Sequence, residues 1–185
     1  MTGFERSRLS TRSARLVLAS ALVLLGLCAG IVVGVRLPTS RPWACVPDGA
    51  IPTSLILFAT IVARNSLVYL LLLAGYWTLG MLSVGMLLMI GFDLGFLMGA
   101  LAVNGCLARA LVITLPHAVF EIPGLLVGGA LGLGGLASWR GMAATQEGVR
   151  DFARVGGLGL AFLLAGALVE STLTRSLLLG IADGQ

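Results

Sequence analysis

The sequence predicts an all-α membrane protein, a polytopic transmembrane helical bundle of about five spans. Hydrophobic residues make up 58% of its 185 residues and charged residues only 11%, whereas a soluble domain has roughly 45–50% and about 25%. The apolar residues also fall in runs close to the roughly 20 residues that cross the hydrocarbon layer of a bilayer. This composition excludes a disordered protein, a nucleic-acid-binding module and an ordinary cytosolic enzyme.

The predicted spans are separated by proline-rich, polar or tight connections. Residues 36–52 contain four prolines, which cannot share a helix interior. The apolar segment 53–63 is too short to cross and predicts an interfacial or re-entrant helix. A tight turn is expected at residues 91–93, where Asp93 would cap the next helix, and Pro116 is expected in the first turn of the fourth helix. The predicted spans are 16–35, 66–90, 92–111, 117–139 and 155–172.

The charges predict a cytoplasmic N-terminus in the cell inner (plasma) membrane. All 12 basic residues are arginine, and four of them precede the first span. Positive segments stay on the inner side, so residues 1–15 are expected to form a basic cytoplasmic tail and 16–185 a single helical membrane domain. A basic patch beside lipid-length apolar runs indicates topology and surrounding membrane lipid, not a nucleic-acid partner. The four arginines are Arg6, Arg8, Arg12 and Arg15.

The three cysteines do not form a disulfide framework. Cys28 and Cys106 lie inside apolar stretches and are expected to pack as small hydrophobic residues. Cys45 lies in the proline-rich loop, where it is either free or paired with another chain.

Three of the predicted spans carry glycines at intervals of four residues. Such spacing forms a smooth stripe that lets helix backbones approach closely in lipid. Membrane helices are also generally rich in glycine, but three triplets in one short chain favour a packing role. The contacts lie either within one chain or between copies in a homo-oligomer. The stripes are Gly26, Gly30 and Gly34; Gly91, Gly95 and Gly99; and Gly124, Gly128 and Gly132.

Polar side chains inside the spans are the candidate functional residues, because they are costly in lipid. His117, the only histidine, and Glu121 are four residues apart and share one helix face. With the N-terminus inside, polar residues from several segments fall in the outer half of the membrane. Arg109 near Glu121 either pairs with it or extends toward the headgroups. The candidate cluster is Asn65, Asn104, Arg109, His117, Glu121 and Glu170.

Three interpretations of this cluster remain open. In the first, the side chains form a structural polar network. In the second, His117, Glu121 and Glu170 are catalytic residues or ligands of zinc or another divalent metal, because an imidazole with two carboxylates suits such ions. A metal hydrolase also needs a general base, and the residue count is one short. In the third, Glu121 or Glu170 binds a peptide or lipid, or relays protons.

The most specific string in the chain is Leu-Pro-His-Ala-Val-Phe-Glu-Ile-Pro-Gly at residues 115–124. It resembles the signature of the stage II sporulation protein M family, Leu-Pro-His-Gly-hydrophobic-Phe-Glu-hydrophobic-Pro. Asn104-Gly105 is similar to the family's Asn-Gly pair, Asn65 to its Asn-Asn element, and Glu170 with Thr174 to its Glu-x-x-x-Thr element. The resemblance covers roughly residues 60–175. The chain departs from the pattern at Ser66, Ala118 and Arg175.

The resemblance implies a polytopic membrane protein that helps to organise the septal, peptidoglycan-remodelling machinery of spore-formers. Relatives beside circular bacteriocin peptides are associated with maturation, export or self-protection. The leading hypothesis is a non-enzymatic scaffold or accessory subunit, without a cofactor, that binds and localises a membrane or cell-envelope protein, with the polar cluster shaping its cavity. The alternatives are an intramembrane enzyme that matures a hydrophobic peptide such as a circular bacteriocin, or a transport or immunity subunit.

Overall fold

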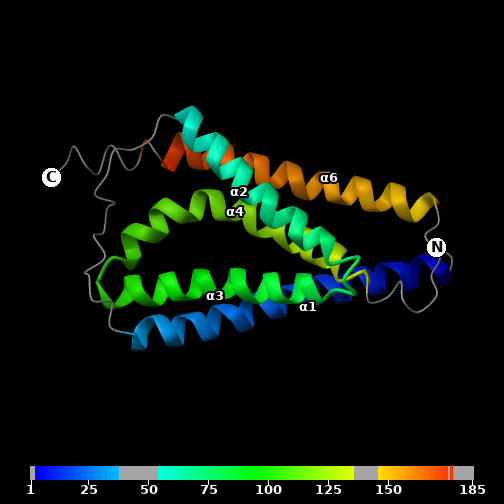
Figure 1. Ribbon diagram of the computed structural model, residues 1–185, viewed down its shortest axis with the longest axis horizontal. Helices are drawn as coiled ribbons and strands as arrows, with labels where there is room; N and C mark the ends of the chain where they lie inside the picture. The colour runs from blue at the N-terminus through cyan, green and yellow to red at the C-terminus, as the bar shows by residue number, and fades with distance from the viewer. Residues whose placement is uncertain (1–2, 38–53, 136–145, 175, 177–185) are drawn as a thin grey trace.

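A computed structural model describes residues 3–37, 54–135, 146–174 and 176 of the chain. All regular structure in these ranges is helical, and five of the helices are long and apolar enough to cross a membrane. The predicted fold class, an all-α membrane bundle, is therefore confirmed. The helices are α1 (Gly3–Arg36), α2 (Ser54–Ala74), α3 (Met81–Val103), α4 (Leu107–Gly132), α6 (Gln146–Val169) and the π-helix η1 (Glu170–Thr174) (Figure 1).

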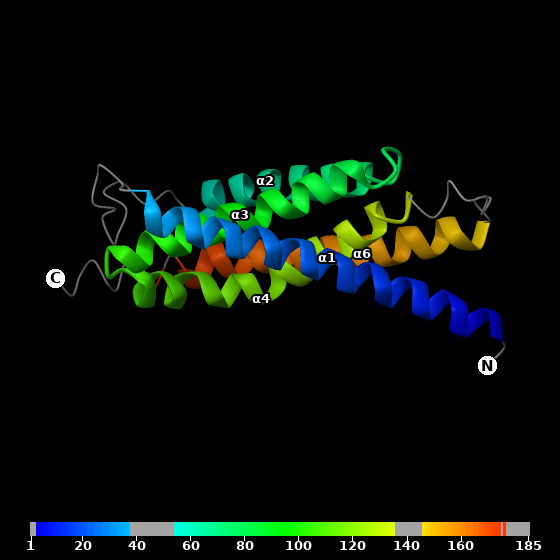
Figure 2. The ribbon, with the colours of Figure 1, turned by 90° about the horizontal axis from the view of Figure 1, so that it is seen from below.

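The helices run up and down along one long axis (Figures 1 and 2). α1 and α3 lie side by side, α4 packs on α6, and α2 contacts α3, α4 and α6. The 34 residues of α1 extend roughly 50 Å at 1.5 Å per residue, which exceeds the roughly 30 Å of hydrocarbon. The N-terminal end of α1 is tied to α6 by an ion pair of 2.6 Å between Arg12 and Asp151.

The closest helix packing joins α1 to α3 through two facing glycine stripes. A Cβ atom added at Gly30 would lie less than 3.0 Å from the backbone of Phe92, and one added at Gly95 equally close to the backbone of Leu27. Successive glycines of α1 meet successive turns of α3, so the two helices are parallel. The structure thus places these glycine contacts within one chain, at Gly26, Gly30, Gly34, Gly91, Gly95 and Gly99.

The third glycine stripe, on α4, faces two different helices. Gly124 lies against the backbone of Gly159 on α6, Gly128 lies against the ring of Tyr69 on α2, and Gly132 meets the backbone of Leu72. These three glycines let α4 pack closely between α2 and α6.

The expected turn at residues 91–93 is wrong, because α3 continues through them. Gly91 is a packing glycine that faces the backbone of Val23, and so it does not mark a turn. The chain turns instead between α2 and α3, where Leu79 and Gly80 have φ angles of 52° and 83°. Asp93 consequently lies at the centre of α3 and is exposed; its expected capping role is also wrong.

Because the chain turns at residues 79–80 and not at 91–93, the predicted spans 66–90 and 92–111 are replaced by α2 (Ser54–Ala74) and α3 (Met81–Val103). The apolar segment 53–63 is not a separate interfacial helix, since residues 54–63 form the first half of α2, which continues through the polar residues 64–66. The predicted span 16–35 lies within α1, which is already helical from Gly3.

The connection between α3 and α4 also lies earlier in the sequence than predicted, at residues 104–106. Asn104 ends α3, and Gly105 has a φ of 71°, a left-handed conformation that glycine adopts without strain. Because α4 begins at Leu107, Pro116 lies inside that helix and not in its first turn. The predicted span 117–139 is described only to residue 135, while α6 begins at Gln146 and extends the predicted span 155–172 at its N-terminal end.

The cysteines differ from the expectation of small hydrophobic residues. Cys106 is 2% exposed, as expected, but it is disulfide-bonded. Cys28 is a free thiol exposed on α1. Cys45, with the proline-rich loop around it, lies outside the described residues.

Replacing Gly30 with alanine should weaken the α1–α3 contact, because the added Cβ would overlap the backbone of Phe92. We expect a loss of about 1–3 kcal/mol, typical of overpacking, measured as a lower thermal unfolding midpoint in detergent. Gly85→Ala is the matched control: a Cβ at Gly85 meets nothing within 4 Å, so the better helix propensity of alanine should leave stability equal or higher. Equal effects of the two substitutions would contradict this packing.

Candidate functional site

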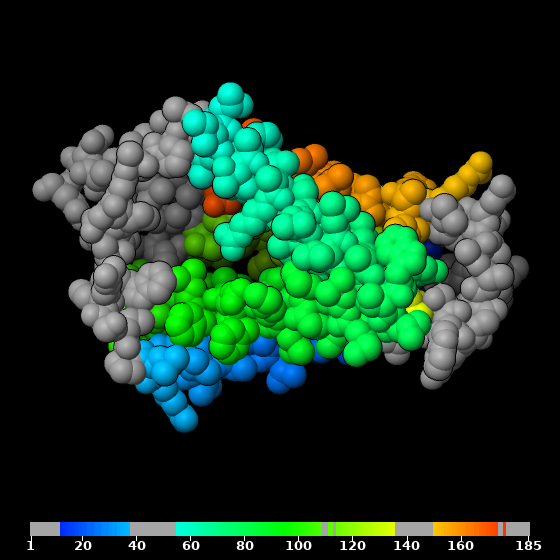
Figure 3. All heavy atoms as spheres, in the orientation of Figure 1, coloured from blue at the N-terminus to red at the C-terminus, as the bar shows by residue number. Residues whose placement is uncertain are grey.

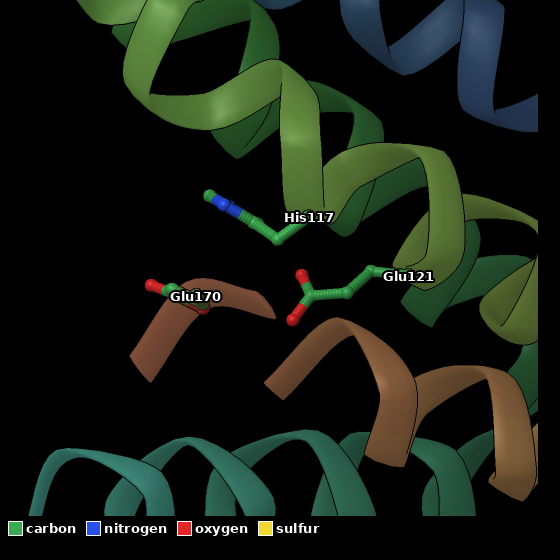
Figure 4. Close-up of side chains that lie close together, drawn as sticks. All are labelled: His117, Glu121 and Glu170. Carbon is green, nitrogen blue, oxygen red and sulfur yellow. The ribbon is translucent and has the colours of Figure 1, made fainter. Parts of the chain in front are cut away.

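Three side chains of the kinds that can bind a metal ion meet where α4 contacts η1. His117 and Glu121 extend from α4 toward Glu170 at the start of η1 (Figure 4). One ligand atom from each residue lies within 4.8 Å of the other two, and all three side chains are partly buried. The structure therefore brings together the only histidine of the chain and two of its carboxylates at membrane depth.

Two prolines flank the polar segment of α4. Pro116 and Pro123 lie inside the helix, where each lacks the backbone N–H that would complete an intrahelical hydrogen bond and crowds the preceding turn. Prolines are the usual cause of helix bending, and α4 follows an arched path in Figure 1. His117 and Glu121 lie between the prolines on one face of this bent segment.

The helical geometry of the last segment changes from α to π at Glu170, which belongs to the site. α6 ends at Val169, and a π-helix begins at Glu170. The hydroxyl groups of Ser171 and Thr172 donate to the carbonyl of Leu168 at 3.1 and 2.7 Å, as short polar side chains do where a helix is distorted. Local π-helical turns are frequent at functional sites, and Glu170 is the first residue of this one.

α2 supplies a hydrogen-bond donor and a positive charge to the cluster. The Nδ2 of Asn65 donates to the Oε1 of Glu121 at 2.5 Å. The charge of the neighbouring Arg64 acts on both Glu121 and Glu170. Glu121 also feels the charge of Glu170, so that Arg64 is close enough to influence two neighbouring acidic groups.

Two residues that support the site were not identified from the sequence. Gly166 lies one turn before Glu170, and a Cβ there would approach within 2.7 Å of the Cγ of Glu121. Tyr69, 3% exposed, donates its hydroxyl to the carbonyl of Gly156 at 2.7 Å and ties α2 to α6. In the sequence, Gly166 precedes Glu170 by four residues and Tyr69 follows Asn65 by four residues. These spacings place each supporting residue on the same helix face as a residue of the cluster.

Two predicted members of the cluster lie elsewhere or outside the described side chains. Asn104 donates its amide to the carbonyl of Ala100 at 2.7 Å. It lines a pocket of about 480 Å³ together with Gly34 and Val103, where α1 and α3 end. Arg109 belongs to the first turn of α4, and its side chain is not among those that the structure describes.

The molecular surface is hollowed between α2 and α3 in the space-filling view, and α4 is visible at the bottom of the hollow (Figure 3). The side chains of His117, Glu121 and Glu170 are only partly buried. α4, which carries two of these residues, is therefore accessible to solvent or a ligand from the face between α2 and α3.

Five membrane-length helices and an internal polar cluster between α2, α4 and η1 define a polytopic integral membrane protein. The family model described as Stage II sporulation protein M matches residues 19–175, and the chain belongs to this family. The resemblance noted for residues 60–175 is confirmed and extends into α1. An uncharacterised protein of Methanocaldococcus jannaschii is 27% identical over 132 residues, covering 67% of this chain and 74% of that protein. No solved structure matches the chain significantly.

A double-mutant cycle on Asn65→Ala and Glu121→Ala should reveal direct coupling between α2 and α4. Because the two side chains are hydrogen-bonded, we expect a coupling free energy of about 0.5–3 kcal/mol in thermal or denaturant unfolding. The control cycle combines Glu121→Ala with Asn104→Ala, whose amide bonds to its own helix. These two effects should add, and a coupling as large as that of the first pair would contradict the arrangement.

Proposed function

We propose that the protein is a non-enzymatic membrane scaffold or accessory subunit that binds and localises a membrane or cell-envelope protein through α3. The observation that carries this proposal is the position of Asp93. It lies at the centre of a membrane-length helix, and its side chain is exposed on the surface of the bundle.

An exposed aspartate at mid-membrane depth needs a polar neighbour. A carboxylate at the centre of a transmembrane helix costs about 2.5–3.5 kcal/mol, and lipid tails offer it no hydrogen bond. α1 covers the opposite side of α3, where Gly91 and Gly95 are buried. Residues one turn away on the same face as Asp93 are apolar and exposed: Met89 at 58% and Leu97 at 37%.

This combination favours a helix of another protein as the occupant of the face. Its apolar side chains would cover Met89 and Leu97, while a cationic or hydrogen-bond-donating side chain at the same depth would bind Asp93. A second copy docked symmetrically through this face would bring two Asp93 carboxylates together, which is unfavourable. Membership of the stage II sporulation protein M family, whose members help to organise septal machinery, agrees with a partner-binding role.

A second candidate function is the maturation of a hydrophobic peptide by an intramembrane enzyme. It is favoured by one observation, the approach of His117, Glu121 and Glu170 to within 4.8 Å. The sequence supplies no separate general base beside three such ligands, and so the scaffold function is preferred.

A photocrosslinking amino acid at position 97 should capture the partner in native membranes. We expect an adduct to a protein whose transmembrane helix carries a cationic or donor side chain. Adding Asp93→Leu should reduce the adduct at least tenfold, because a charged hydrogen bond contributes about 1.5–3 kcal/mol. The same probe at Leu168, exposed on α6, is the control that Asp93→Leu should not affect. An adduct only to a second copy, or one insensitive to Asp93→Leu, would exclude this interface.

We infer that the N-terminus is cytoplasmic and that the chain lies in the inner (plasma) membrane. The α3–α4 connection, with the disulfide-bonded Cys106, lies at the opposite end of the bundle from Arg12, because α3 runs parallel to α1. Disulfides persist in oxidising compartments outside the cytosol, whereas arginine-rich segments remain inside. Both signals support the same orientation.

Thiol labelling of intact cells tests this orientation. In a Cys28→Ser background, a membrane-impermeant maleimide should label Cys106 only after an impermeant reductant is added outside. Labelling that requires cell lysis even when the reductant is present would reverse the proposed topology.

A further inference from the structure

We propose that His117, Glu121 and Glu170 form a binding site for a divalent first-row transition-metal ion such as zinc. This inference does not depend on the identity of a partner protein. It rests on the geometry of the cluster, on its charge and on the hydrogen bond from Asn65.

The three ligand atoms are close to the separations that a metal ion imposes. Zinc bonds to nitrogen and oxygen ligands are about 2.0–2.2 Å long, which places tetrahedral ligands roughly 3.4 Å apart. The ligand atoms of the cluster lie within 4.8 Å of one another. Side-chain rotations that move these atoms by about 1 Å would therefore close the site around an ion without moving α4 or η1.

The charges around the cluster favour a cation. Glu121 and Glu170 place two acidic groups beside each other; among the described residues, the charge of Arg64 acts on both and that of His117 acts on Glu121. Uncompensated charge is expensive where water is scarce. A divalent ion between the two carboxylates would neutralise them, and the imidazole of His117 favours a transition metal over magnesium or calcium.

Asn65 has the position of a residue that orients a ligand. Its amide holds the Oε1 of Glu121 and leaves Oε2 to face the ion. Hydrogen bonds of this kind fix ligand direction, and their loss typically weakens metal binding by about 10–100-fold. We therefore assign Asn65 a positioning role and not a ligand role.

Three protein ligands leave a fourth position in a tetrahedral site, which is the arrangement of zinc sites that accept water or another molecule. The hollow between α2 and α3 reaches α4 (Figure 3). The ligand class that this position would take is an oxygen donor: water, a carboxylate or a peptide carbonyl.

Metal binding is measured on the purified full-length protein in detergent, after treatment with a chelator and equilibration with zinc. We expect about one zinc ion per chain for the wild type by elemental analysis, and visible cobalt(II) absorption that zinc displaces. His117→Ala and Glu170→Gln should each abolish both signals. Asn65→Ala should retain the site but weaken zinc affinity by about 10–100-fold.

Asp93→Asn is the control, because it removes an intramembrane carboxylate outside the cluster and should leave zinc binding unchanged. Size-exclusion chromatography identifies variants that remain folded, and Glu170→Gln preserves side-chain shape if His117→Ala does not fold. Wild-type protein that binds no more zinc than folded Glu170→Gln would overturn the proposal. That outcome leaves the partner interface at Asp93 untouched, because the crosslinking experiment changes none of His117, Glu121 and Glu170.

Discussion

Close backbone contact between α1 and α3 is the interaction on which the rest of this bundle depends. Apolar side chains gain little by leaving lipid for one another, so membrane helices associate through dispersion at short range and through polar contacts. Glycines such as Gly30 and Gly95 remove the side chains that would separate the two backbones. The contact also fixes the rotation of α3, and thereby places Asp93 on the face turned away from α1.

Polar groups in this membrane domain are compensated in two different ways. Glu121 finds partners within the chain, a donor in Asn65 and the charge of Arg64. Asp93 is exposed on the face of α3 turned away from α1, where lipid or another protein can contact it. The internal cluster therefore suits binding of a small ligand or ion, whereas the exposed carboxylate suits helix recognition. Both inferences follow from the high cost of polar groups in hydrocarbon.

Much of the site followed from the sequence because depth is readable from topology. His117 and Glu121 share a face through their four-residue spacing, and alternating spans place Asn65 and Glu170 in the same half of the membrane. Asn104 was expected at the same depth, but it ends α3 and its side-chain amide bonds within that helix. Gly91 was misread because a glycine that permits close packing and one that permits a turn look identical in sequence. The supporting residues Gly166 and Tyr69 act across helix interfaces, and their four-residue spacings within one helix do not reveal which helix they contact.

From the residues alone came the lipid environment, the helical class, the family resemblance and the short list of polar side chains that lipid would penalise. These features depend on composition and on position along the chain, and both are readable in one dimension. The tertiary structure added the pairing of the first two glycine stripes, the choice of Asn65 as the partner of Glu121 and the exposure of Asp93. Those depend on how each helix is rotated about its own axis, and steric fit between neighbouring helices sets that rotation.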